Sequence, residues 1–172
     1  NYGMAICVAA GNEGPGISSV AGTAALNNII SIGAYATPEM MQNDFGWIIK
    51  EPQLWYFSAT GPGKNGQTAP LAVAPGSAVS CFPMWADYPY QLDQGSSMAA
   101  PHVAGAAALL MDAVAHQLYR SDARAVWMAL LGGAEPLEGY QAAEQGYGAI
   151  NLMRSWKEIR NLKDNPLYYQ LK

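Results

Sequence analysis

Two adjacent serines, Ser96 and Ser97, stand at the start of a long apolar segment, where a serine hydroxyl could act as a nucleophile in acyl transfer. The segment begins Gly95-Ser96-Ser97-Met98-Ala99-Ala100-Pro101-His102-Val103-Ala104-Gly105. From Met98 to Val114 its only charged residue is Asp112. A segment that is apolar on every face predicts a central helix buried on all sides inside a larger domain.

Pro101 sets the expected start of this helix. Proline is best tolerated in the first turn, where its missing N–H would have no intrahelical partner, so the helix is predicted to start within a residue or two of 97–99. Ser97 then lies at the helix N-terminus, where free N–H groups and the macrodipole stabilise an oxyanion. The alternative is that Ser96 or Ser97 serves only as an N-cap.

Asn12 is the second residue that could take part in this chemistry. It follows Met4–Ala10, a continuous apolar run that ends at Gly11 and is typical of a strand buried on both faces of a parallel sheet. Ligand sites of open α/β sheets lie at the carboxyl edge, so Asn12 is predicted to lie near Ser97. The glycine-rich run 11–16 lacks the GxGxxG spacing and the Lys-Ser/Thr ending of phosphate loops.

The segment 95–105 closely resembles the nucleophile signature of the subtilisin-like serine peptidases, Gly-Thr-Ser-Met-Ala-x-Pro-His-Val-Ala-Gly. The family also carries Ala-Ala-Gly-Asn-x-Gly about eighty residues earlier, and Ala9-Ala10-Gly11-Asn12-Glu13-Gly14 stands here 85 positions before the serine. The resemblance implies that Ser97 is the nucleophile and that the Asn12 side chain completes an oxyanion hole. It also implies peptide or protein substrates. The sequence assigns no cofactor and no metal ligands, and it leaves calcium binding open.

The same resemblance suggests where a substrate would bind. Ala9, Ala10 and Gly11 match the family's substrate-binding segment, and counting back from Gly33-Ala34 places Ala21 at the base of the S1 pocket. Ala21 would leave room for a sizeable apolar side chain. The departure from the family's usual Pro at Gly22-Thr23 makes this assignment less direct than that of Asn12.

Neither histidine of the chain suits the role of general base to Ser97. His102 would lie roughly 140° around the helix from Ser97, and His116 roughly 28 Å along its axis. The resemblance implies that His102 is structural and that the catalytic Asp and His precede Asn1, in an upstream segment or a separate chain. Two hypotheses follow: the C-terminal half of a serine peptidase, or a non-catalytic subtilase-like binding or scaffolding domain.

The predicted fold is a three-layer α/β sandwich with a mostly parallel sheet, and residues 1–172 are expected to form the C-terminal portion of one subtilisin-like domain. Further strands are expected at Leu26–Ala34 and in the run that ends at Pro75-Gly76. Two helices should follow, capped by Ser121 and by Asn151. The motifs around 33–41 most resemble the tripeptidyl peptidase II branch.

Composition argues against several other functions. The 172 residues carry nine Lys and Arg against thirteen Asp and Glu, with a formal charge of −4, so no basic stripe suits nucleic acid. Residues 98–115 approach the length of a membrane span but contain Pro101, His102 and Asp112, so a membrane span is rejected. Cys7 and Cys81 have no metal-ligand spacing and are expected to be buried free thiols that favour a cytoplasmic over a secreted location only weakly.

Overall fold

The computed structural model describes residues 3–81, 85, 87–88, 90–118 and 123–164. Its strands are β1 (Cys7–Ala9), β2 (Ile30–Ala36), β3 (Gln53–Leu54), β4 (Ala72–Pro75), β5 (Ser77–Cys81) and β6 (Tyr90–Gln94). Its helices are η1 (Gly22–Ala25), α1 (Pro38–Phe45), α2 (Ser96–Leu118), α3 (Ala123–Gly132), α4 (Ala142–Gln145) and α5 (Leu152–Asp164).

Strand β2 is the centre of the main sheet. It pairs in parallel with β1, with Cys7 opposite Ile30, and in parallel with β4, with Ile32 opposite Ala72. The short β3 pairs antiparallel with the end of β2. The sheet is therefore mostly parallel, as predicted, although β2 begins at Ile30 rather than at Leu26.

Side-chain alternation along β1 and β2 divides the core between the two faces of the sheet. Ile30, Ile32, Ala34 and Ala36 of β2 all pack into one cluster with the buried side chains of α2. Ala10, just after β1, packs into a second cluster on the other face. The remaining buried members of that second cluster are Val20, Ala24, Ala59 and Ala69.

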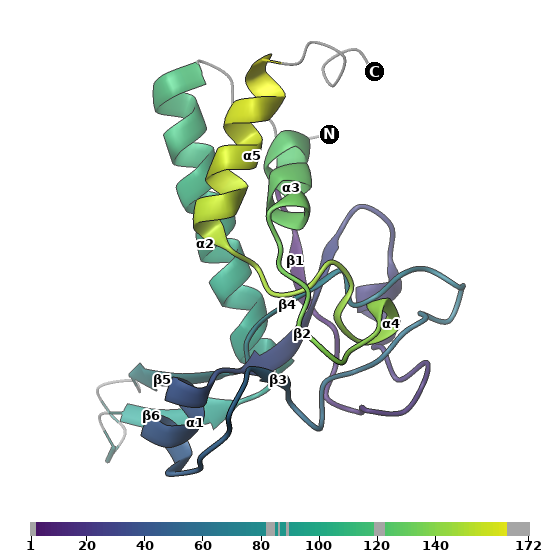
Figure 1. Ribbon diagram of the computed structural model, residues 1–172, viewed down its shortest axis with the longest axis vertical. Coiled ribbons are helices and arrows are strands. Elements are labelled where there is room, and N and C mark those ends of the chain that lie inside the picture. Colours follow the sequence, from purple (N-terminus) through teal and green to yellow (C-terminus); the bar gives the residue numbers. More distant parts are fainter. Residues whose placement is uncertain (1–2, 82–84, 86, 89, 119–122, 165–172) are drawn as a thin grey trace.

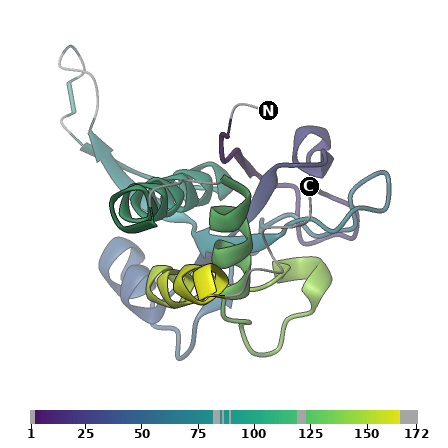
Figure 2. The same cartoon turned by 90° about the horizontal axis from the view of Figure 1, so that it is seen from above.

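Helices α2, α3 and α5 stand together on one face of the sheet (Figure 1). Seen from above, α5 lies beside α2 and α3 (Figure 2). The opposite face is covered by η1 and by the loop segments that carry Val20, Ala59 and Ala69. This layered α/β arrangement agrees with the predicted sandwich around a mostly parallel sheet, and it brings the carboxyl end of β1 to the start of α2.

Burial of α2 departs from the sequence expectation. Its buried side chains form a stripe that faces the sheet: Ala99, Ala100, Val103, Ala107, Leu110 and Val114. On the other side Ala104, Gly105 and Ala108 are exposed, and Leu109 is 61% exposed. The prediction of burial on every face is therefore wrong for the described residues, because the sheet and helices α3 and α5 cover only part of the circumference of α2.

Helix α2 is also the one described helix that is long and apolar enough to cross a membrane. Core helices of folded domains can also be this long and this apolar. Helix α2 packs against β1, β2 and β4, as a core helix does.

Helix α2 begins at Ser96, which confirms the predicted start within a residue or two of 97–99. Pro101 nevertheless lies in the second turn rather than the first, where it removes the hydrogen bond that the Ser97 carbonyl would accept. Ser97 and Pro101 are both exposed, so water can reach that carbonyl. The predicted cap at Asn151 is confirmed, because its Oδ1 accepts from the Arg154 N–H. The other predicted cap, Ser121, lies outside the described residues.

Candidate active site

Asn12 and the first turn of α2 meet at the carboxyl edge of the sheet, although they are far apart in the chain. The Asn12 Oδ1 atom accepts from the Ser96 backbone N–H at 2.8 Å and from the Ser96 hydroxyl at 2.9 Å. The Ser96 Oγ atom in turn accepts from the Gly11 N–H at 3.2 Å. These three hydrogen bonds join the loop after β1 to the helix that bears Ser97.

The Ser96 N–H determines which way the Asn12 amide points. A backbone N–H only donates, so the Asn12 atom that faces it must be the oxygen, and the Nδ2 group is turned the other way. A Cβ placed on Gly95 would lie 3.2 Å from Nδ2. Nδ2 donates to no other group in the part of the chain that the structure describes, so its protons are available to a ligand.

The N–H groups in the first turn of α2 have different partners. The Ser96 N–H donates to Asn12, and those of Met98 and Ala99 donate to the Gly95 carbonyl at 3.0 and 3.3 Å. The Ser97 N–H has no partner among the described residues, and Ser97 itself is exposed. Ser96 and Ser97 both lie inside the helix, with Gly95 before it, so the N-cap alternative is wrong for both serines.

Neither histidine contacts Ser97. His102 is exposed, and its Nδ1 lies 2.8 Å from the Met98 carbonyl oxygen, an interaction within the helix. His116 lies near the far end of α2 and pairs with Asp112 at 3.4 Å. Within the described residues the Ser97 hydroxyl therefore has no general base beside it.

The predicted substrate-binding residues follow one another along the loop after β1. The Ala21 N–H donates to the Ala10 carbonyl at 2.8 Å, and a Cβ placed on Gly11 would lie 3.5 Å from the Ala21 Cβ. Ala10 is fully buried, whereas Ala9, Gly11 and Ala21 are partly exposed. The Ala9 side chain packs against the cluster beneath α2, whereas Gly11 and Ala21 are partly exposed and lie against each other.

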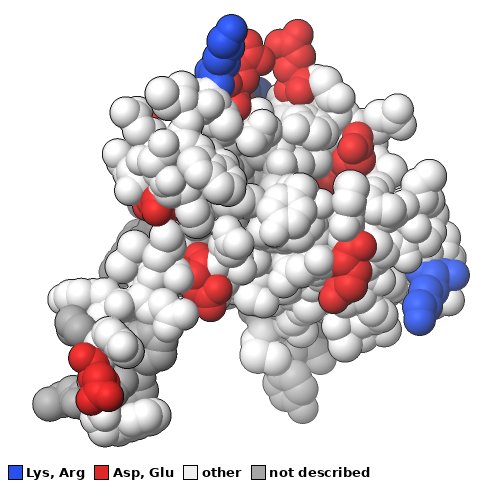
Figure 3. All heavy atoms as spheres, turned by 90° about the horizontal axis from the view of Figure 1, so that it is seen from below, with Lys and Arg blue, Asp and Glu red and all other residues white. Residues whose placement is uncertain are grey.

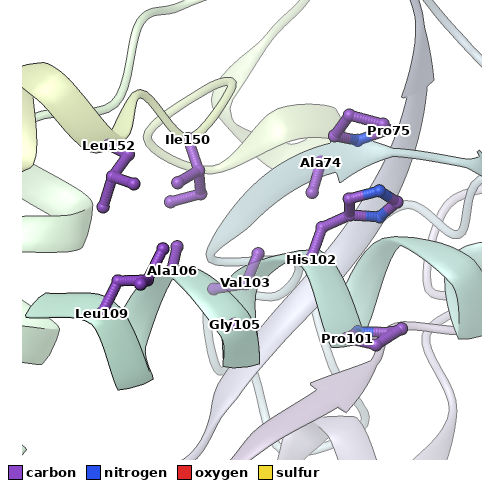
Figure 4. A pocket seen from close by; sticks show the side chains of 10 residues that line it. All are labelled: Ala74, Pro75, Pro101, His102, Val103, Gly105, Ala106, Leu109, Ile150 and Leu152. Atoms are coloured by element: carbon purple, nitrogen blue, oxygen red, sulfur yellow. The ribbon is translucent and has the colours of Figure 1, made fainter.

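A cavity of about 460 Å³ lies elsewhere, between α2, the end of β4 and the start of α5 (Figure 4). It is lined mostly by alkyl groups, with His102 at one end. Neither Ser97, Asn12 nor Ala21 lines it. The chemistry predicted from the sequence thus belongs to the open edge of the sheet rather than to this cavity.

Two side chains at the site were not predicted. Ser96 is 1% exposed and binds Asn12, and the Glu13 carboxylate accepts from the Asn12 backbone N–H at 2.9 Å. Adjacent serines after a glycine at a helix start were a signal for Ser96, because two neighbours on a helix face different directions and only one can point inward. Nothing in the local sequence distinguished the carboxylate of Glu13 from an ordinary solvated one.

The cysteines, the potential metal ligands and the surface charges of the described residues indicate no second site. Cys7 is a free thiol, as expected, but it is only partly buried, and burial raises its pKa above the ordinary value. The Cys81 side chain lies outside the described residues. No group of three or more potential metal ligands occurs in the described ranges, and on the face shown in Figure 3 acidic side chains are scattered among neutral ones without a basic patch.

Comparison with known proteins shows the family of the chain. Residues 1–149 match the Subtilase family. The chain belongs to the subtilase family. The predicted resemblance to the subtilisin-like peptidases is thereby confirmed.

Named relatives of this subtilase chain are peptidases. It is 31% identical to pyrolysin of Pyrococcus furiosus over 96% of the chain and 30% identical to tripeptidyl-peptidase 2 of Drosophila melanogaster over 99%. The predicted resemblance to the tripeptidyl peptidase II branch is borne out by these matches, with pyrolysin equally similar. The chain spans only 13% and 12% of the length of these two relatives.

Solved structures agree with the subtilase fold. The PatG macrocyclase in complex with peptide matches over 90% of this chain and 43% of its own, with a TM-score of 0.69 and 26% identity. The prenylagaramide maturation protease PagA matches over 88% and 49%, with a TM-score of 0.65 and 23% identity. The chain therefore has part of a subtilisin-like fold.

Proposed function

We propose that this chain is the nucleophile-bearing half of a serine peptidase, with Ser97 as nucleophile and Asn12 as an oxyanion-hole donor. The observation that carries the proposal is the orientation of the Asn12 amide. Its oxygen is held by Ser96, which leaves Nδ2 free beside the start of α2. The unpartnered Ser97 N–H at the same helix start is the second donor that the mechanism requires.

In this mechanism the Ser97 Oγ atom attacks the carbonyl carbon of a peptide bond while a base takes the hydroxyl proton. The carbonyl oxygen becomes an oxyanion, which Asn12 Nδ2 and the Ser97 N–H stabilise. The C–N bond then breaks, the amine leaves with the proton, and water hydrolyses the acyl-enzyme by the same steps. The positive end of the α2 dipole favours the negative intermediate.

The acid and base must come from outside residues 1–172, in an upstream segment or a separate chain. Two features favour such a partner half. Strand β1 pairs only with β2 among the described strands, and Met4 and Ile6 beside it are 67% and 45% exposed. The second feature is the exposed apolar flank of α2. In this proposal, residues 1–172 are therefore the C-terminal portion of a single peptidase domain. We call the chain together with that half the assembled enzyme.

The proposed substrate is a peptide or protein whose residue before the scissile bond is apolar. Relatives named as peptidases support the reaction class, and the small Ala21 side chain near Gly11 supports the preference. Ala9 to Gly11 would line the substrate-binding edge. A non-catalytic scaffolding role is the second candidate, favoured by the lack of a base beside Ser97 in the described part of the chain.

Covalent labelling and turnover of the assembled enzyme test the proposal. We expect a peptidyl fluorophosphonate to label Ser97 and the Ser97→Ala variant to be unlabelled. Asn12→Leu should lower kcat on the order of 10²–10³-fold, the loss measured for such a donor in subtilisin, a member of the same family, with KM nearly unchanged. An assembled enzyme that is not labelled at Ser97, or an Asn12→Leu variant with full turnover, would favour the scaffold.

A further inference from the structure

An exposed turn between Gly63 and Gln67 carries the pair Asn65-Gly66, and Asn65 is the one asparagine of the sequence that a glycine follows. The Gly63 N–H donates to the Gln67 carbonyl at 2.9 Å, and the Gly66 N–H donates to the Gly63 carbonyl at 2.8 Å. Gly66 has a φ of +80°, and a Cβ placed on it would meet nothing within 4 Å. Asparagine followed by a left-handed glycine suits such a turn, and it also places an amide beside an unhindered backbone nitrogen.

We propose that Asn65 is a site of spontaneous deamidation, at which its side chain reacts with the Gly66 backbone nitrogen. The nitrogen attacks the Asn65 Cγ atom and forms a new N–C bond, while solvent takes the N–H proton. The Cγ–Nδ2 bond breaks, and the amide nitrogen leaves as ammonia after taking a proton from solvent. Water then adds to either carbonyl of the cyclic succinimide and opens it to aspartate or to an isoaspartyl linkage. The reaction needs only water and is independent of the proposed peptidase function.

Two features of this turn favour reaction at Asn65. The attacking nitrogen belongs to a glycine, which has no side chain to hinder its approach to the amide. The turn is exposed, and the Asn65 amide makes no hydrogen bond to any described residue. Local opening of the hydrogen bond between Gly66 and Gly63 therefore suffices to free the nitrogen.

Asn12 and Asn151 lack both features. The Asn12 amide oxygen accepts from the Ser96 N–H and hydroxyl, and the Asn151 amide donates to the Glu135 carboxylate at 3.0 Å. The residue after each of them carries a side chain that hinders the backbone nitrogen. We therefore expect Asn65 to react before either of these two asparagines.

An isoaspartyl linkage would lengthen the backbone of the turn by one methylene between Gly63 and Gln67. Gly63 packs closely on η1, because a Cβ placed on it would lie 2.7 Å from the Ala25 Cβ. A longer turn would disturb this contact and the hydrogen bond between Gly63 and Gln67. We expect the isoaspartyl form of the assembled enzyme to unfold at a temperature a few degrees below that of the unmodified form.

The experiment is peptide mapping by mass spectrometry after incubation of the assembled enzyme in mildly alkaline buffer, with the Ser97→Ala change present to prevent self-digestion. The peptide that contains Asn65 should gain the mass expected when a carboxylate replaces an amide, and it should separate into aspartyl and isoaspartyl forms. Peptides that contain Asn12 or Asn151 should keep their mass over the same period. Asn65→Gln is the matched control: its amide would have to close a larger ring, so the turn should keep its mass.

An Asn65 peptide that keeps its mass, or that changes only after the protein is denatured, would mean that the native turn protects the residue and would overturn the inference. Formation of aspartate without isoaspartate would overturn the succinimide step, because direct hydrolysis of the amide gives aspartate alone. Equal modification of the wild-type and Asn65→Gln turns would place the reaction at another residue. These measurements do not depend on turnover, so their outcome leaves the proposed peptidase function as it stands.

Discussion

At the scale of single residues, Gly14 shows how closely the loop that carries Asn12 packs on its neighbour. The Gly14 N–H donates to the Phe57 carbonyl at 2.9 Å, and the Gly11 carbonyl accepts from the Ala59 N–H at 3.2 Å. A Cβ on Gly14 would lie 1.8 Å from the Ser58 carbonyl oxygen, which is backbone and cannot move alone. Two residues away, a Cβ on Gly16 would meet nothing within 4 Å.

We therefore expect Gly14→Ala to destabilise the assembled enzyme by about 1–3 kcal/mol and to lower turnover by displacing Asn12. Gly16→Ala is the matched control and should leave both properties nearly unchanged. Thermal unfolding and steady-state kinetics of the two variants provide the measurement. Equal stability of the two would mean that the loop does not pack on residues 57–58 as described.

At the scale of elements, the contact between α3 and α5 depends on Gly133. A Cβ there would lie 2.4 Å from the Ser155 backbone nitrogen, whereas one on Gly132 would lie 3.8 Å from the nearest atom, the Glu158 Cγ. Gly133→Ala should force α5 away from α3 and reduce stability by about 1–3 kcal/mol. Gly132→Ala should be neutral or slightly stabilising, because alanine restricts the unfolded chain. Denaturant unfolding of the two variants measures their free energies of unfolding. A Gly132→Ala variant destabilised as much as Gly133→Ala would contradict the prediction.

Glu135 contributes to the same region through the N-terminus of α5. Its carboxylate accepts from the Asn151 side-chain amide at 3.0 Å and pairs with Arg154 at 2.6 Å. These hydrogen bonds, from Asn151 first and then Arg154, hold the pKa of Glu135 below its ordinary value of 4.5. Both partners of the ion pair are about half exposed, so the effect on stability is small.

The pH dependence follows from the direction of that shift. A depressed pKa in the folded state stabilises the fold above pH 4.5, and this contribution is lost as the pH falls through the folded-state pKa. Glu135→Gln should therefore unfold at a slightly lower temperature than wild type near pH 7, and the difference should fade in acid. A difference that grows as the pH falls below 4.5 would show that the sign is wrong.

At the scale of the whole molecule, the described part of the chain covers its core incompletely. One edge of β1 has no described partner, and an apolar flank of α2 that includes Leu109 is open to solvent. Unpaired strand edges and large exposed apolar surfaces promote association between chains. We expect residues 1–172 expressed alone to aggregate or to bind a hydrophobic dye, and to become monodisperse when joined to the half that supplies the acid and base.

Size-exclusion chromatography and thermal unfolding of the isolated chain and of the assembled enzyme test this expectation. The assembled enzyme should unfold cooperatively, whereas the isolated chain should not. A monomeric, cooperatively unfolding preparation of residues 1–172 would contradict the expectation and would weaken the case for a partner half.

Sequence by itself determined those features that depend on residues close together in the chain. The apolar run before Gly11 predicted β1 and placed Asn12 after it, the run after Ser97 predicted α2, and Asn151 was correctly predicted as a cap. Each is governed by periodicity, by backbone propensity or by a hydrogen bond within a few residues. The match between the two motifs and the subtilase family follows from the same local patterns.

Only the tertiary structure decided which serine faces Asn12, which way the Asn12 amide points and which flank of α2 is buried. The contact between Ser96 and Asn12 joins residues 84 positions apart, and its geometry is set by how α2 packs on β1 and β2. The sequence of a helix that is apolar all round does not indicate which of its faces will pack against the sheet. Burial on every side was therefore predicted, whereas in the structure only one stripe of α2 is buried. The start of α2 was predicted correctly to within a residue or two of 97–99, but Pro101 lies in the second turn and not in the first.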